Sequence, residues 1–146
     1  MLAKENVEIA GGCLCGAVRY VIQGRLRDVI DCHCWKCRRF HGHAGAYTSV
    51  HREQLQLTAE SELKWYRSVT DETYDVHRGF CRESGSSLFW DPRGAPHIAV
   101  AAGSLDTSTG LRTIGHVWVS QLADYESITD GLPQFPRSHG GKLDLL

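Results

Sequence analysis

The six cysteines constrain this chain more than any other feature of its sequence. They fall into three groups along the chain: Cys13 with Cys15, then Cys32, Cys34 and Cys37, then Cys81. A chain of 146 residues has the length of one domain and can bury a core of its own. It therefore does not need a disulfide framework to fold. Grouped thiols in such a chain indicate metal ligation or redox chemistry.

The opening residues, MLAKENVEIAGG, have no continuous apolar segment and no cleavage signature. We therefore expect neither a signal peptide nor a bilayer span, and we predict a cytoplasmic location, where thiols stay reduced. The formal net charge is -1 with the eight histidines counted neutral, which gives no general attraction to nucleic acid or to an anionic membrane. Neither is a predicted partner, and the oligomeric state is left open.

Short runs rich in β-branched and aromatic residues, broken by Gly, Asp and Ser, dominate the chain. They predict a mainly β, loop-rich, single-domain fold with these strands: 7–9, 17–22, 46–50, 63–67, 73–80, 87–90, 97–101 and 115–119. Helix is limited to a turn after Cys37 and a short one near 104–109. The turn DPRGAP at 91–96 separates two strands. The predicted domain is 1–146, with a core of about 9–135 and a loose polar tail at 136–146.

The segment DCHCWKC is the densest group of thiols. Cys32 and Cys34 are two residues apart and point to one face of an extended segment, and Cys34 with Cys37 forms a Cys-x-x-Cys loop. Three thiols can hold one zinc ion at about 2.3 Å and leave its fourth position open, as in catalytic zinc sites. A redox dithiol is an alternative, but it leaves one thiol unexplained. Copper or an iron–sulfur cluster is another. His33, between two ligands, should point away from the metal.

Two other stretches carry the remaining thiols. Cys13 and Cys15 in GGCLCGAV can likewise face one ion. The stretch FCRESGSSLFW reads as a Cys-x-x-Cys-Gly knuckle that begins at Cys81, with Ser84 where the second thiol would stand. At each of these cysteines, the alternative is packing as a small apolar side chain.

Basic and imidazole side chains follow the densest thiol group. Three thiolates on a divalent zinc carry a net charge of about -1. Arg38 and Arg39 can offset this charge or bind the carboxylates of an anionic thiol compound, although a solvated surface is the alternative. His41 and His43 are candidate proton donors beside the open position, and an ordinary loop role is the alternative for each.

Five segments occur in the order seen in a known family: GGCLCGAVRY, CHCWKCRR, RGFCRESGSSLFW, GSLD and DGLPQF. Over residues 9–135 the chain resembles the glutathione-dependent formaldehyde-activating enzyme family, which includes centromere protein V. The resemblance implies a zinc-stabilised, mostly β fold like that of small Rab-associated zinc proteins. It also implies carbon–sulfur lyase activity that adds glutathione to formaldehyde.

The resemblance further implies two zinc sites. The structural set consists of three thiols: Cys13, Cys15 and Cys81. The catalytic set, with an open fourth position, consists of Cys32, Cys34 and Cys37. Ser84 departs from the pattern, because it stands where the fourth structural thiolate would be and a serine hydroxyl does not readily lose its proton. The structural site is therefore expected to be weakened. Three outcomes are open: water or Ser84 completes it, His77 substitutes, or it stays empty.

Two functions follow from the sequence. In the first, a small thiol such as glutathione enters the open zinc position, and a carbon–sulfur bond forms or breaks at formaldehyde or a related small electrophile. In the second, both thiol groups are structural, and the protein is a non-catalytic zinc-binding structural or interaction module. A fourth protein ligand at the Cys32, Cys34 and Cys37 site would favour the second function.

Overall fold

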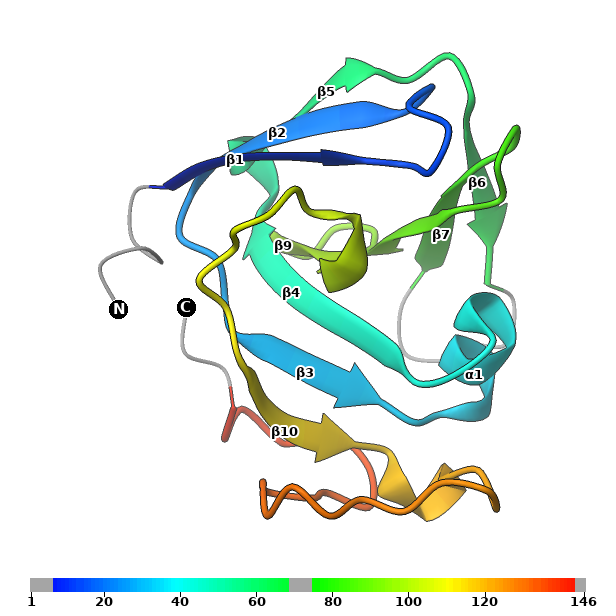
Figure 1. Cartoon of the computed structure of the whole chain (residues 1–146), viewed down its shortest axis with the longest axis vertical. Helices are drawn as coiled ribbons and strands as arrows, with labels where there is room; N and C mark the ends of the chain where they lie inside the picture. The colour runs from blue at the N-terminus through cyan, green and yellow to red at the C-terminus, as the bar shows by residue number, and fades with distance from the viewer. Residues whose placement is uncertain (1–6, 69–74, 144–146) are drawn as a thin grey trace.

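The structure, a computed structural model, describes residues 7–68 and 75–143. These residues form two β-sheets and a short helix (Figure 1). The strands are β1 Val7–Gly12, β2 Arg19–Gly24, β3 Val29–Cys32, β4 Gly45–His51, β5 Leu55–Ala59, β6 Leu63–Arg67, β7 Val76–Cys81, β8 Ser87–Pro92, β9 His97–Ala101 and β10 Thr113–Val117. The helix is α1, Trp35–His41, and the 3-10 turns are Arg52–Gln54, Ala102–Ser104 and Val119–Gln121.

The smaller sheet has the strand order β1-β2-β5, and the larger has the order β10-β3-β4-β9-β8-β7-β6. Neighbouring strands are antiparallel except for β10 and β3, which are parallel. Antiparallel neighbours can be joined by short turns, which suits a chain with little helix. The three parts of the chain that carry cysteines thus come from the ends of β1, β3 and β7.

The main core lies between the two sheets. Tyr20 and Ile22 of β2 alternate with more exposed neighbours and are fully buried, as expected for a strand with one face on the core. They pack with residues of the larger sheet, among them Val50, Phe89 and Val100. The rings of Tyr20 and Phe89 meet edge to face, with centroids 5.2 Å apart. Burial of these apolar side chains is the principal stabilising contribution to the sandwich.

The opposite face of β4 carries α1. Successive residues of a strand point to opposite faces, so Tyr47 points away from the core that holds Val50. Tyr47 packs with Cys34 and Cys37 in a small separate cluster. The helix ends at Gly42, whose φ of 80° is the left-handed conformation common after helices. Among the described residues, no helix has the length and apolar character needed to cross a membrane.

The mainly β, single-domain prediction is confirmed. Two strands were not predicted, β3 and β5, and β3 matters because it ends at Cys32. The helix predicted near 104–109 is wrong, because the helical turn there covers only Ala102–Ser104. Strand β8 runs on to Pro92, so the turn predicted at 91–96 is shorter than expected. The start of the strand predicted at 73–80 lies outside the described residues.

Two contacts join the described part of the tail to the larger sheet. The Trp118 amide donates a hydrogen bond to the Arg137 carbonyl at 2.9 Å. Leu143 is only 8% exposed and packs with Ile30 and Val117. The tail is mostly polar, but its Leu143 side chain packs on β3 and β10 of the larger sheet.

Candidate metal centres

The thiols meet in two groups of three, as the resemblance to the family implies. Cys13, Cys15 and Cys81 form the first cluster, and Cys32, Cys34 and Cys37 form the second cluster. Within each cluster all sulfur atoms lie within 4.8 Å of one another, and each cysteine is a free thiol. No His, Asp or Glu of residues 7–68 and 75–143 joins either cluster under the same distance limit.

The spacing of the first cluster suits a tetrahedral ion. The Cys13 and Cys15 sulfurs are 3.6 Å apart, and those of Cys15 and Cys81 are 3.7 Å apart. Thiolates at about 2.3 Å from a tetrahedral zinc are separated by about 3.8 Å. The three sulfurs therefore lie close to the separation that a zinc ion requires, and the cluster fits such a metal.

Backbone turns hold the first cluster in place. The loop after β1 folds back so that the Val18 amide donates to the Cys13 sulfur at 3.2 Å. At the end of β7, the Ser84 amide donates to the Cys81 sulfur at 3.4 Å. Burial opposes ionisation of Cys13, but hydrogen bonds from Val18, Cys15, Cys81 and Ser84 outweigh it and lower the pKa of Cys13 to about 6.

Ser84 belongs to a small network of serines beside the first cluster. Its hydroxyl lies 3.2 Å from the Ser86 hydroxyl, which accepts the Leu14 amide hydrogen at 2.8 Å. His77, considered above as a substitute ligand, instead places Nε2 3.2 Å from an Asp75 carboxylate oxygen. His77 therefore does not take the place of the fourth ligand in this structure.

The second cluster is more deeply enclosed. Cys32 ends β3, Cys34 caps α1 and Cys37 lies in its first turn, where its amide donates to the Cys34 sulfur at 3.3 Å. Cys34 is 6% exposed and Cys37 is 4% exposed. Hydrogen bonds from Cys32 and Cys37 lower the pKa of Cys34 to about 2 despite its burial. Hydrogen bonds within the cluster, together with burial, raise the pKa of Cys32. The hydrogen bonds within the cluster thus favour the thiolate form at Cys34 over Cys32.

A buried arginine contacts the second cluster. Arg78 of β7 is 3% exposed, and its Nη1 donates to the Cys37 sulfur at 3.7 Å. The same guanidinium bonds Ser68 at 3.4 Å and lies over the Phe40 ring at 5.6 Å. Sequence reasoning missed Arg78. The available signal was its place in the alternating segment TYDVHRGF, where Arg78 shares a strand face with Val76, and an arginine on a buried face needs a buried partner.

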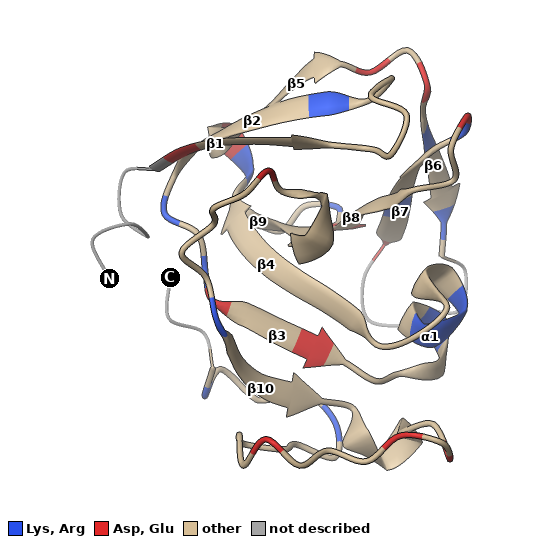
Figure 2. Ribbon diagram, in the orientation of Figure 1, with Lys and Arg blue, Asp and Glu red and all other residues tan. Residues whose placement is uncertain are grey.

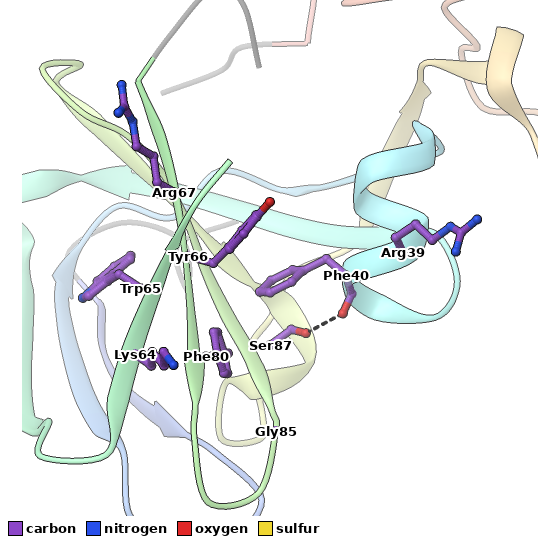
Figure 3. Close-up of a pocket in the computed structure, with 9 residues that line it drawn as sticks. All are labelled: Arg39, Phe40, Lys64, Trp65, Tyr66, Arg67, Phe80, Gly85 and Ser87. Atoms are coloured by element: carbon purple, nitrogen blue, oxygen red, sulfur yellow. Dashed lines mark hydrogen bonds between the residues drawn. The ribbon is translucent and has the colours of Figure 1, made fainter. Parts of the chain in front are cut away.

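The arginines predicted from the sequence lie elsewhere around α1, whose basic residues are visible in Figure 2. Arg38 donates to the Gln121 carbonyl at 2.7 Å and so anchors the 3-10 turn after β10. Arg39 lines a groove of about 750 Å³ with Phe40, Tyr66 and Phe80. In Figure 3 the Arg39 side chain extends away from these rings. Of the arginines discussed, Arg78 is the one with a hydrogen bond to a cluster sulfur.

A histidine and a tyrosine lie beside the second cluster. His41 Nε2 is 2.5 Å from the Tyr47 hydroxyl, and Tyr47 packs against Cys34 and Cys37. Burial, with a further contribution from the charge of Arg78, lowers the pKa of His41 to about 4. Burial raises the pKa of Tyr47 well above its ordinary value. Both groups are therefore neutral at pH 7, and they form a hydrogen-bonded pair next to the thiols.

Another histidine chain supports the loop that carries Cys32 and Cys34. His33 is 2% exposed, and its Nε2 lies 2.9 Å from His116 Nδ1. His116 Nε2 lies 2.7 Å from an Asp130 carboxylate oxygen. His33 thus takes no part in the second cluster and ties its loop to the segment DGLPQF. Sequence reasoning assigned no role to Asp130 and placed His116 only in a buried strand.

Both thiol clusters lie in a part of the chain that matches a known family. A family model described as glutathione-dependent formaldehyde-activating enzyme matches residues 8–121, a range that includes both thiol clusters. The chain belongs to this family. The glutathione-dependent formaldehyde-activating enzyme family is enzymatic, and two clusters of thiols that could each hold a metal ion agree with membership.

A solved structure shows the same fold. A crystal structure of a Rhodobacter sphaeroides protein matches with a TM-score of 0.57 and 21% sequence identity. The match covers 86% of this chain and 98% of that protein. The sandwich described here is therefore an arrangement that a crystallised protein also adopts, over nearly its whole length.

Proposed function

We propose that the chain is a zinc-dependent carbon–sulfur lyase that acts on a thiol adduct of glutathione with formaldehyde or a related small electrophile. The observation that carries the proposal is the second cluster. Its three sulfurs converge, and within the described ranges no fourth protein ligand joins them. Three protein ligands with one open position are typical of catalytic zinc. The family description names both glutathione and formaldehyde.

In the proposed reaction, Cys32, Cys34 and Cys37 would hold the ion, and its fourth position would be taken by the thiol of the substrate. Bound there, zinc would lower the pKa of that thiol and keep it as a thiolate at neutral pH. Arg78 donates to the Cys37 sulfur and offsets part of the negative charge that three thiolates create. Because Arg78 is buried, its charge is poorly screened and acts strongly on the cluster.

The bond changes need one proton at oxygen. The glutathione sulfur attacks the carbonyl carbon, a carbon–sulfur bond forms, and the carbonyl electron pair moves to the oxygen, which takes up a proton. In the reverse direction the carbon–sulfur bond breaks and that proton is returned. We assign the proton transfer to Tyr47 and His41, because Tyr47 packs against Cys34 and Cys37 and His41 is hydrogen-bonded to the Tyr47 hydroxyl.

Basic residues of α1 are the candidates for binding the carboxylates of glutathione. Arg38 and Arg39 stay predictions for this role. Arg39 borders the groove of Figure 3 together with Lys64, so it can contact an anion that enters there. We also propose a cytoplasmic location, because reduced thiols are maintained there.

Exchange NMR with glutathione and ¹³C-formaldehyde tests the proposal. The zinc-loaded chain is expected to accelerate interconversion of free formaldehyde and its glutathione adduct. Cys34→Ser should remove the acceleration, whereas Cys15→Ser, the matched change in the first cluster, should leave most of it. An interconversion rate equal to the spontaneous one would exclude this activity.

A non-catalytic zinc-binding module is the second candidate function, favoured by Ser84, which stands where the family pattern would place a fourth structural thiolate. Zinc X-ray absorption separates the candidates. A second cluster that gains sulfur coordination when glutathione is added supports the enzyme. A coordination shell that is complete and unchanged by glutathione supports the module.

A further inference from the structure

The first cluster opens onto a cavity. A space of about 690 Å³ is lined by Cys13 of the cluster together with Leu14, Arg19, His41 and Ser86. Cys15 is exposed, and Leu14, between the two cysteines, is 88% exposed. Pockets of about 300–1,000 Å³ accommodate small molecules. A small ligand can therefore reach this cluster at two points, from the cavity at Cys13 and from solvent at Cys15.

The cluster keeps its shape without a fourth thiol. Ser86 accepts the Leu14 amide hydrogen and contacts the Ser84 hydroxyl, so the turn after β7 is joined to the loop that carries Cys13 and Cys15. The sulfur separations of 3.6 and 3.7 Å already match those around a tetrahedral ion. The three thiols are thus preorganised as three corners, and the fourth corner is not filled by a thiol of the chain.

The chemistry of the fourth corner favours sulfur. Three thiolates select a soft or borderline metal, for which another thiolate is a better ligand than a hydroxyl or water. Ser84 replaces the thiol by a hydroxyl that is engaged with Ser86. Amide hydrogens of Val18 and Ser84 already point at the Cys13 and Cys81 sulfurs, which eases the accumulation of negative charge.

We propose that Cys13, Cys15 and Cys81 form a second open metal centre, which takes a small thiol from the adjoining cavity as its fourth ligand. With a serine at position 84, the chain supplies no fourth thiolate here, so the centre is left open as a binding site. This inference goes beyond the proposed function, which assigns a thiol only to the second cluster. It predicts that the chain binds small thiols at two metal centres.

Cadmium NMR of the full chain tests the inference, because the ¹¹³Cd resonance moves downfield with each thiolate bound. The chain loaded with ¹¹³Cd should give two resonances, and Ser84→Cys should move one of them downfield, which assigns it to the first cluster. Stoichiometric glutathione should then move this resonance downfield in the unmodified chain and leave it in place in Ser84→Cys. Ser84→Ala should respond as the unmodified chain does.

Two results would overturn the inference. One is a first-cluster resonance that glutathione does not move, because Ser84 or water then closes the site. The other is an equal movement with S-methylglutathione, which has no free thiol. The resonance of the second cluster is read in the same spectra and reports the proposed function independently. A failure at one cluster is therefore distinguishable from a failure at the other.

Discussion

Two turns of four residues, Cys34–Cys37 and Cys81–Ser84, show how a metal-binding frame is built. In each turn the amide of the last residue donates to the sulfur of the first, at 3.3 Å and 3.4 Å. The Cys34–Cys37 turn, in the second cluster, ends in a cysteine and continues into α1. The Cys81–Ser84 turn, in the first cluster, ends in a serine and reverses through Gly85 into β8. The backbone therefore forms the same amide-to-sulfur contact whether or not the last side chain is a thiol.

The surroundings of the two turns differ more than their backbones do. The second cluster lies at the N-terminus of α1, with a buried guanidinium against one of its sulfurs. The first cluster has an exposed thiol at Cys15 and a serine network at its side. Burial and a fixed positive charge suit a centre that must control the reactivity of a bound thiolate. An exposed thiol at the edge of a centre suits the exchange of a bound ligand with solvent.

The largest expected effect separates the clusters by activity. Cys34→Ser removes the thiol at the N-terminus of α1, which is itself a proposed metal ligand. Changing residues that only hydrogen-bond to metal ligands lowers activity by up to roughly 100-fold, so Cys34→Ser should lower it by at least that factor. It should also remove one zinc per chain by elemental analysis. Cys15→Ser is the control for loss of a thiol. Equal losses of activity in the two variants would contradict the division of roles.

Arg78→Met tests whether the buried cation acts on the second cluster alone. Loss of the contact with the Cys37 sulfur should weaken zinc binding there by about 10- to 100-fold and leave the first cluster unaffected. Competition with a chromophoric chelator measures both sites. Arg78→Lys should recover part of the affinity, because it restores the charge without the second contact to Ser68. Unchanged affinity in Arg78→Met would remove the electrostatic role.

Ser84→Cys makes the two turns chemically alike. A fourth thiolate should raise zinc affinity at the first cluster by about 10- to 100-fold, which corresponds to about 1.4–2.8 kcal/mol. At limiting zinc, this gain should appear as a rise in the unfolding temperature of several degrees. Calorimetry with and without a chelator measures it. A rise that persists in the chelator would mean that the thiol stabilises by packing and not through the metal.

The sequence was sufficient to group the thiols, because residues two or three apart are held together by local backbone geometry. Pairing of Cys81 with Cys13 and Cys15 came from the resemblance to a family, and the structure brings these three sulfurs together. Arg78 was not predicted, because its contact with Cys37 depends on how β7 and α1 meet across the sheet. Arg38 and Arg39 were considered instead because they are neighbours of Cys37 in sequence.

Strand β3 was missed for a related reason. Its four residues, VIDC, are too short to show alternation, and its pairing with β4 and β10 is what makes it a strand. The support from His33 to His116 and Asp130 likewise joins segments far apart in the chain. Contacts of this kind are set by tertiary packing, which a local pattern does not contain.

The smallest expected effect compares the glycines that follow the two turns. Gly42 ends α1 with a φ of 80°, and Gly85 follows Ser84 with a φ of 76°. At both positions an added Cβ meets no atom within 4 Å. Alanine should therefore cost only the backbone strain of the left-handed conformation, about 1–2 kcal/mol, at each position. Denaturant unfolding of Gly42→Ala and Gly85→Ala in the presence of a chelator measures it.

Adding zinc should separate these two variants. Gly85→Ala disturbs the amide that donates to the Cys81 sulfur, so it should weaken metal binding only at the first cluster. Gly42→Ala lies one helical turn beyond Cys37 and should leave both affinities unchanged, because the amide-to-sulfur contact of the second cluster is at the opposite end of α1. A loss of affinity at the second cluster in Gly42→Ala would mean that the whole of α1, and not its first turn, holds the metal frame.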